Sequence, residues 1–124
     1  MTAPATPLVN ATLVNASAVG QVAPVADGNS GASFTVDWTK GATHKITLSA
    51  TCVFAFTAPI GPVTNENLTI YLTQNGGFTA TWPATVKWTG AAPPTLTSTA
   101  AAVDVITFKW DGTNYWGILS PNFA

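Results

Sequence analysis

The sequence predicts an all-β domain, an antiparallel β-sandwich or jelly-roll-like barrel of about eight short strands, preceded by an extended N-terminal arm. Apolar residues alternate with polar ones from residue 32 onward, which is typical of half-buried strands. Clusters of Gly, Pro, Asn and Asp separate these runs, and no window has a helical period. Its 124 residues match one domain. We divide the chain into an arm, residues 1–31, and a β domain, residues 32–124.

Each alternating run has an apolar face that we expect to be buried. In chain order these faces are formed by Phe34, Val36 and Trp38; Ile46, Leu48 and Ala50; Cys52, Phe54 and Phe56; Leu68, Ile70 and Leu72; Phe78, Ala80 and Trp82; and Ile106, Phe108 and Trp110. A short run, Val86–Trp88, follows Pro83, and residues 89–94 are predicted to be a loop.

Turn residues predict how some runs are connected. Residues 68–73 and 78–82 flank Asn75-Gly76-Gly77, and residues 103–110 and 113–119 flank Asp111-Gly112. Because Asn-Gly and Asp-Gly favour the positive φ angles of tight turns, both pairs of runs are predicted to be β-hairpins. Residues 27–31, Asp-Gly-Asn-Ser-Gly, predict a loop between the arm and the domain.

The arm differs in composition from the β domain. It has prolines at positions 4, 7 and 24, and a five-residue repeat, Leu-Val-Asn-Ala-Thr/Ser, at residues 8–12 and 13–17. Proline and β-branched residues favour an extended conformation, and such a segment can add to a sheet edge of its own domain or of a neighbour. The candidate partner-binding residues are the apolar ones of the arm: Leu8, Val9, Leu13, Val14, Val19 and Val22.

Charge is scarce. Charged residues make up 7% of the chain, where about 25% is typical of soluble domains. There are four lysines, no arginine and a formal net charge of −1. Surfaces near zero net charge associate readily, so the composition favours a subunit of an assembly. The alternative is a free domain whose surface is covered by uncharged but hydrated threonine.

Few residues could carry catalysis. His44 is the single histidine, and we interpret it as a residue at a strand end rather than as a general base. Cys52 is in phase with Phe54 and Phe56, which predicts a small buried side chain. Asp104 is expected to cap a turn or to accept a backbone hydrogen bond. No Cys/His or Asp/Glu spacing predicts a metal or cofactor, so we expect no catalytic residues, no metal, no cofactor and no enzyme activity.

Tryptophans are concentrated in residues 81–117, so these rings either form the core or are covered by a partner. Strand phase places Trp82, Trp110 and Trp116 in the core. Trp88 and Tyr115 lie next to loops and are the candidate carbohydrate contacts, since exposed aromatic rings mark recognition surfaces. Nucleic-acid binding is not expected, because four lysines do not make a basic groove. No apolar run has the length of about 18 residues that a membrane span requires.

Several segments in order carry a resemblance to a known family. They are DWTKG at 37–41, ITL at 46–48, LTIYLTQNGG at 68–77, TWP at 81–83, VKW at 86–88, PTLT at 94–97, VDVITF at 103–108 and DGT at 111–113. Together they resemble a β domain of tailed-bacteriophage virion proteins, over residues 33–124. The resemblance implies a structural, non-enzymatic role in a symmetric particle, commonly as a homotrimer, with no catalytic residues to transfer.

Two functions follow from this resemblance. A tail fibre needs a shaft and an attachment region, whereas only an arm of about 30 residues precedes this domain. We therefore expect a capsid decoration (cement) protein, made in the bacterial host cytoplasm, that binds the major capsid protein on the outer surface of the virion. The alternative is a receptor- or glycan-binding tip of a tail fibre or head fibre, with Trp88 and Tyr115 as its carbohydrate contacts.

Overall fold

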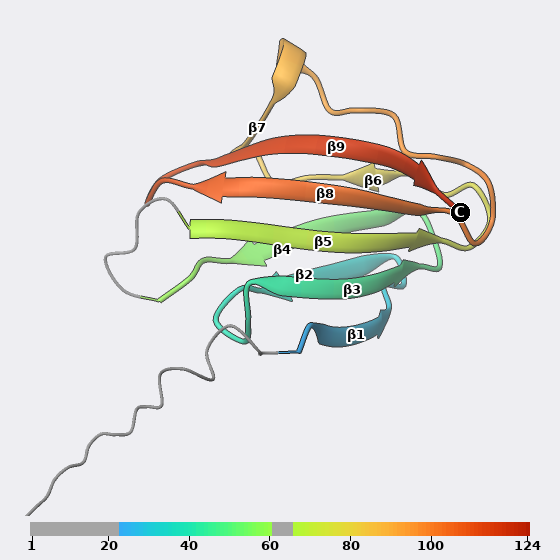
Figure 1. Ribbon diagram of the computed structural model, residues 1–124, viewed down its shortest axis with the longest axis horizontal. Helices are drawn as coiled ribbons and strands as arrows, with labels where there is room; N and C mark the ends of the chain where they lie inside the picture. Colours follow the sequence, from blue (N-terminus) through green and yellow to red (C-terminus); the bar gives the residue numbers. More distant parts are fainter. Residues whose placement is uncertain (1–22, 61–65) are drawn as a thin grey trace, which may run out of the picture.

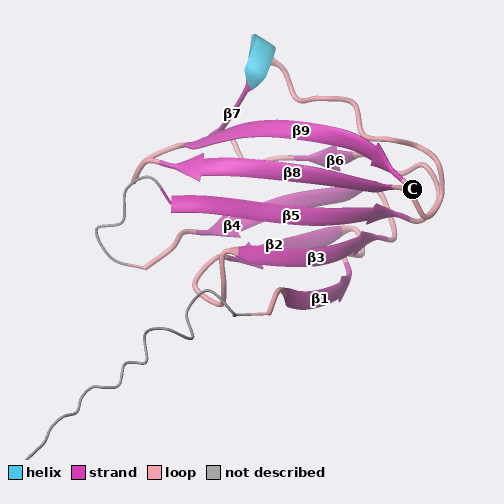
Figure 2. Ribbon diagram, viewed as in Figure 1, coloured by secondary structure: helices cyan, strands magenta, loops and turns pink. Residues whose placement is uncertain are grey.

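The computed structural model describes residues 23–60 and 66–124, which form a sandwich of two β-sheets (Figures 1 and 2). The six-stranded sheet has the order β1-β3-β5-β8-β9-β7, and the three-stranded sheet behind it in Figure 1 has the order β2-β4-β6. The all-β class and the sandwich arrangement are confirmed. In the larger sheet the strands are β1 (Val25–Asn29), β3 (Thr43–Leu48), β5 (Glu66–Gln74), β8 (Val103–Trp110), β9 (Tyr115–Phe123) and β7 (Val86–Trp88); in the smaller they are β2 (Ser33–Asp37), β4 (Cys52–Thr57) and β6 (Ala80–Thr81).

The chain alternates between the two sheets from β1 to β6. Strands β1, β3 and β5 lie side by side in the large sheet, and β2, β4 and β6 lie side by side in the small one. All neighbours within these two groups are parallel. A parallel neighbour requires a crossover connection. Here the crossover is a strand of the opposite sheet, so β1–β6 form three turns of a flattened coil.

This coil contradicts the predicted antiparallel pairing. Only β5–β8 and β8–β9 are antiparallel, and β7 pairs with β9 in parallel. The hairpin predicted around Asn75-Gly76-Gly77 is also wrong, because β5 and β6 belong to different sheets. Gly76 and Gly77 do have positive φ, 144° and 84°, but their loop carries the chain across the sandwich. A short loop rich in glycine suits either path, so local sequence does not distinguish them.

The C-terminal hairpin is confirmed. Strands β8 and β9 pair in antiparallel register from Trp110↔Tyr115 onward, around a turn at Asp111–Asn114. The turn is closed by the Asp111 carboxylate, which accepts hydrogen bonds from the backbone N–H groups of Thr113 (2.8 Å) and Asn114 (2.7 Å). These hydrogen bonds lower the pKa of Asp111, that from Asn114 most. Beyond the turn, residues 115–117 also pair with β7.

Strand β1 lies in the segment predicted to be arm and loop. Val25–Asn29 pairs with β3 at the edge of the large sheet, so the prediction of a loop over residues 27–31 is wrong for its first three residues. A bulge between Ala26 and Gly28 explains the difference, and Gly28 supplies a φ of 77° there. The remaining residues of the predicted arm, 1–22, lie outside the described residues.

The core lies between the sheets and has the predicted alternation. Ile70, Ile106 and Leu48 are fully buried on the inner face of the large sheet, and Val36 and Cys52 on that of the small sheet. Larger rings fill the space near β7 and β9. The aromatic residues packed there are Trp38, Phe54, Phe56, Trp82, Trp88, Phe108, Trp110 and Tyr115.

Gln74 holds the corner between β5 and β6. Its side-chain carbonyl accepts hydrogen bonds from the backbone N–H groups of Asn75, Gly77 and Phe78. Its amide nitrogen donates to the carbonyl oxygens of Phe78 (3.0 Å) and Thr97 (2.9 Å). Gln74 itself is 4% exposed, whereas its partners Asn75 and Gly77 are exposed residues of the loop. From the sequence, Gln74 was expected only to begin the turn before Asn75, and its hydrogen-bonding role was not predicted.

Replacing Gln74 by Ala tests this corner. We expect the free energy of unfolding to fall by about 3 kcal/mol, because the buried Gln74 side chain is lost together with all of its hydrogen bonds to the loop backbone. Urea unfolding measures the change. Asn75→Ala, at an exposed neighbouring position, is the control and should remain within about 0.5 kcal/mol of the original protein. Equal stabilities of the two variants would show that Gln74 does not organise the corner.

Candidate functional site

His44 lies inside β3 and is fully buried. Its Nδ1 is 2.5 Å from Oδ2 of Asp27, the residue at the β1 bulge, and its Nε2 is 3.1 Å from the carbonyl oxygen of Gly41. Both ring nitrogens of His44 therefore have an oxygen partner, one in a side chain of β1 and one in the backbone before β3. The ring therefore joins β1, β3 and the loop before β3. His44 is near the start of β3, as predicted, but it is fully buried and its contacts connect elements of the fold.

Other reactive side chains have similar structural roles. Cys52 is fully buried, as predicted, and burial raises the pKa of its thiol. Asp104 accepts hydrogen bonds from the backbone N–H groups of Thr97 (2.8 Å) and Asn122 (2.9 Å), which confirms the predicted backbone contact. Within residues 23–60 and 66–124 there is no cluster of three His, Cys, Asp or Glu side chains placed to hold a metal ion.

Two aromatic residues of β9 have the reverse of their predicted exposure: Tyr115 is buried and Trp116 is exposed. Tyr115 is 3% exposed and packs on Trp110, with ring centroids 4.3 Å apart, so it is not available to a carbohydrate. Trp116 is 50% exposed and is not a core residue. Successive side chains of a strand point to opposite faces, so the burial of Tyr115 directs Trp116 outward.

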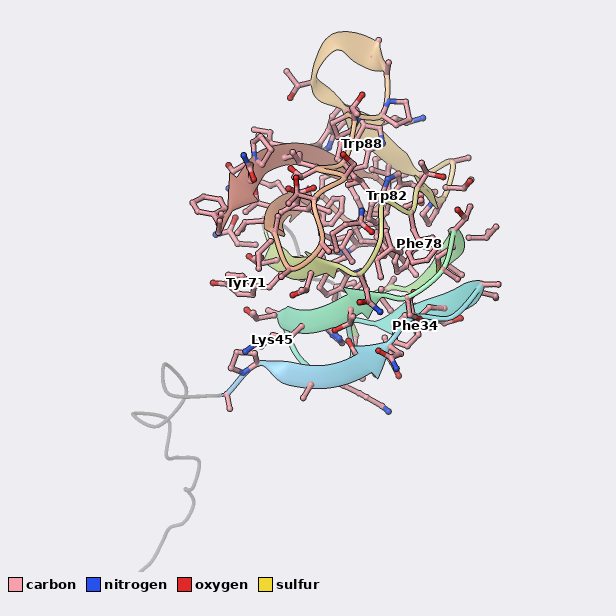
Figure 3. All side chains as sticks on the ribbon, turned by 90° about the vertical axis from the view of Figure 1, so that its right-hand side faces the viewer. Phe34, Lys45, Tyr71, Phe78, Trp82 and Trp88 are labelled. Atoms are coloured by element: carbon pink, nitrogen blue, oxygen red, sulfur yellow. The ribbon has the colours of Figure 1, made fainter. Side chains whose placement is uncertain are left out.

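Trp82 and Trp88 lie between the core and the surface, above the small sheet in Figure 3. Trp82 stacks on Phe54 at 4.8 Å with an interplanar angle of 9°, and Trp88 contacts Trp82 edge-on at 5.5 Å. The ring of Trp88 lies over Gly117, where an added Cβ would be 2.7 Å from its nearest ring atom. Glycine at 117 is thus required for this ring to pack on β9.

An open groove of about 560 Å³ follows these rings to the outer surface. It is lined by Trp82, Trp88 and Trp116, by Lys87, and by the loop residues Pro83, Ala84, Ala91 and Pro93, with Val86 at its base. Trp88, one of the two predicted carbohydrate contacts, therefore lines this groove. Its aromatic neighbour there is Trp116 and not the other predicted contact, Tyr115. Trp116 also borders two smaller hollows on the outer face of the large sheet.

Trp116 lies between two lysines. Lys87 of β7 and Lys109 of β8 are its direct cross-strand neighbours, one on each side. All three side chains are exposed on the outer face of the large sheet. The side chain of Lys87 donates a hydrogen bond to the carbonyl oxygen of Ala84 (3.3 Å) at the groove. We call Lys87, Trp116 and Lys109 the Lys-Trp-Lys row.

Asp111 fixes the ring at the centre of the row. The indole Nε1–H of Trp116 donates a 2.8 Å hydrogen bond to Oδ2 of Asp111. The other carboxylate oxygen is bonded to the backbone of the β8–β9 turn. Trp116 is thus a half-exposed aromatic ring held in one orientation between two ammonium groups. Sequence analysis missed this row, because it placed Trp116 in the core. Lys109 alternates with the apolar Phe108 and Trp110, which indicates an outward side chain, but the pairing of β7 with β9 is needed to bring Lys87 beside the others.

The six predicted partner-binding residues of the arm, Leu8, Val9, Leu13, Val14, Val19 and Val22, lie outside the described residues. Comparison with known proteins found no matching family model, curated protein or solved structure. The assignment of function therefore rests on the residues of this chain.

Alanine substitutions distinguish the two neighbouring tryptophans. Trp110→Ala should lower the free energy of unfolding by about 3–5 kcal/mol, because it empties a buried site. Trp116→Ala should lower it by about 1 kcal/mol or less, because the ring is half exposed and its hydrogen bond lies at the surface. Urea unfolding of both variants measures this, and similar losses would contradict the outward placement of Trp116.

Because of Tyr115, we expect the stability of the protein to fall at alkaline pH. Burial raises the pKa of its phenol from 10.0 to about 12. The fold favours the neutral phenol, so its contribution is complete below the unfolded pKa and is lost as pH rises from about 10 to about 12. Tyr115→Phe should reduce this loss of stability, measured as urea midpoints at pH 8 and pH 11. Tyr71→Phe removes an exposed phenol and is the control. An unchanged pH dependence in Tyr115→Phe would contradict the burial of the phenol.

Proposed function

We propose that the chain is a non-enzymatic structural subunit of a tailed-bacteriophage virion, a capsid decoration protein that binds the major capsid protein on the outer surface of the particle. In this proposal it is a homotrimer made in the host cytoplasm, and it needs no metal or cofactor. The observation that carries the proposal is the outer face of the three-stranded sheet, on which Asp37 is the one charged residue of the described strands, together with the open edge of that sheet. The ordered resemblance described above supports the phage assignment.

The outer face of the small sheet has mostly small, uncharged side chains. Its exposed residues are Ser33, Thr35, Val53, Ala55, Thr57 and Thr81, and Val53 is 58% exposed. Asp37, at the end of β2, adds one carboxylate to this face. It accepts hydrogen bonds from the backbone N–H and the hydroxyl of Thr39, and the hydroxyl bond is the main cause that lowers its pKa. Such a face can be buried against another protein without removing many charges from water.

The edge strand β2 is open to strand addition. It pairs only with β4 among the described residues. Edge strands usually carry lysine, proline or a bulge that prevents pairing with another chain. Strand β1 has such a bulge, whereas β2, Ser-Phe-Thr-Val-Asp, has none of the three. An extended segment of a neighbouring subunit or of the arm can pair with β2 through main-chain hydrogen bonds.

A truncation tests the proposal. Because β1 begins at Val25, removing residues 1–22 takes away all six apolar arm residues and leaves the sheet complete. We expect the shortened protein to remain folded, with an unchanged unfolding midpoint, and to lose cosedimentation with capsids that lack the native copy. Removal of residues 1–7 alone is the control, and it should retain binding because Leu8–Val22 remains.

Two results would overturn the proposal. One is full capsid binding by the protein that lacks residues 1–22. The other is imaging of intact particles in which the chain occurs only at the tail. A tail position would favour the second candidate, a receptor- or glycan-binding tip, which is supported by one observation, the exposed Trp116 beside the groove.

A further inference from the structure

The two outer faces of the sandwich differ in charge. Lys45, Lys87 and Lys109 are exposed on the outer face of the large sheet, and the carboxylate of Asp111 lies at the centre of the Lys-Trp-Lys row, bonded to Trp116. The oxygens of Asp111 already accept hydrogen bonds from Trp116 and from two backbone N–H groups. Three of the four basic residues of the chain therefore occupy this face, and Figure 3 shows Lys45 and Tyr71 on it, opposite Phe34.

The spacing within the Lys-Trp-Lys row is set by the sheet. Neighbouring strands lie about 4.8 Å apart, so the stems of Lys87 and Lys109 begin roughly 10 Å apart with Trp116 midway. The indole ring is held by Asp111 and needs little ordering when a ligand binds. Asn67 and Thr107 border the hollow next to Lys109 and Trp116, and their side chains can donate and accept hydrogen bonds.

These groups match the chemistry of a charged sugar chain. The C–H face of a pyranose ring packs on an indole, its hydroxyls bond to amide and hydroxyl side chains, and its carboxylates pair with ammonium groups. We propose that the Lys-Trp-Lys row binds an acidic polysaccharide, with one sugar ring stacked on Trp116 and carboxylates of the same chain at Lys87 and Lys109. The groove past Trp82 and Trp88 extends the path of the sugar chain beyond Lys87.

Two other occupants fit less well. A second copy bound through the same face would place lysines against lysines, and like charges across an interface are unfavourable. Single-stranded nucleic acid needs a cationic groove along its backbone and a series of stacking rings, whereas this row has one exposed ring between two ammonium groups. The inference does not depend on attachment to a capsid, because it uses the sheet opposite to the one proposed for assembly.

The test measures binding of the full-length protein to polygalacturonate by calorimetry at low salt, with dextran as the neutral polymer. We expect saturable binding to polygalacturonate, none to dextran, and weaker binding as salt is raised. Lys87→Gln/Lys109→Gln should weaken binding about tenfold, since each exposed charge contact contributes at most about a factor of five. Trp116→Ala should weaken it by a similar factor, and Trp116→Phe, which keeps a flat ring, by less.

Lys40→Gln is the matched control, because it removes the same charge from the turn after β2, away from the row. It should change the affinity less than twofold. The proposal is overturned if the wild-type protein does not bind polygalacturonate, or if Lys40→Gln weakens binding as much as the double variant. Tighter binding to oligothymidylate would assign the face to nucleic acid, and a lower native mass of Trp116→Ala would assign it to self-association; either result also overturns the proposal. The double variant alters only exposed side chains, so its result does not depend on a folding defect.

Discussion

A layer of interlocking aromatic rings between the two sheets is the interaction on which the rest of the structure depends. Phe56 of the small sheet contacts Trp38, Phe108 and Tyr115 at centroid distances of 5.4, 5.4 and 4.9 Å. Edge-on ring pairs contribute about 0.5–1.5 kcal/mol beyond the burial of their area. Three parallel turns of short strands bury few side chains each, so these large rings supply much of the apolar contact that holds the sheets together.

Polar residues in the interior serve the corners of the coil. Ser30 and Ser49 exchange hydrogen bonds between two successive corners, since Ser49 N–H donates to Ser30 Oγ and Gly31 N–H donates to Ser49 Oγ. Gln74 fills the third corner, and the pair His44–Asp27 joins the edge strand β1 to β3. Buried backbone groups at a corner have no strand partner and must find another acceptor or donor. These polar side chains therefore bond to backbone groups at the corners and join β1 to β3.

The coil also separates two surfaces with different chemistry. Each turn contributes one strand to each sheet, so the outer faces are built from different residues of the same sequence. The small sheet has a face with few charges, and its edge strand β2 has one partner strand among the described residues. The large sheet carries the Lys-Trp-Lys row, which suits an anionic ligand.

The sequence by itself determined the positions of the strands from β2 onward, the faces that are buried in β2 to β5 and β8, and the C-terminal hairpin, because alternation and the Asp-Gly turn are local signals. Tertiary structure decided the parallel coil and the row around Trp116. A short loop such as Asn75-Gly76-Gly77 can return the chain to the same sheet or carry it to the opposite one. Adjacent aromatic residues such as Tyr115 and Trp116 suit either phase of a strand, and a one-residue change of phase exchanges core and surface. Only the packing of Tyr115 on Trp110 and Phe56 selects the observed arrangement.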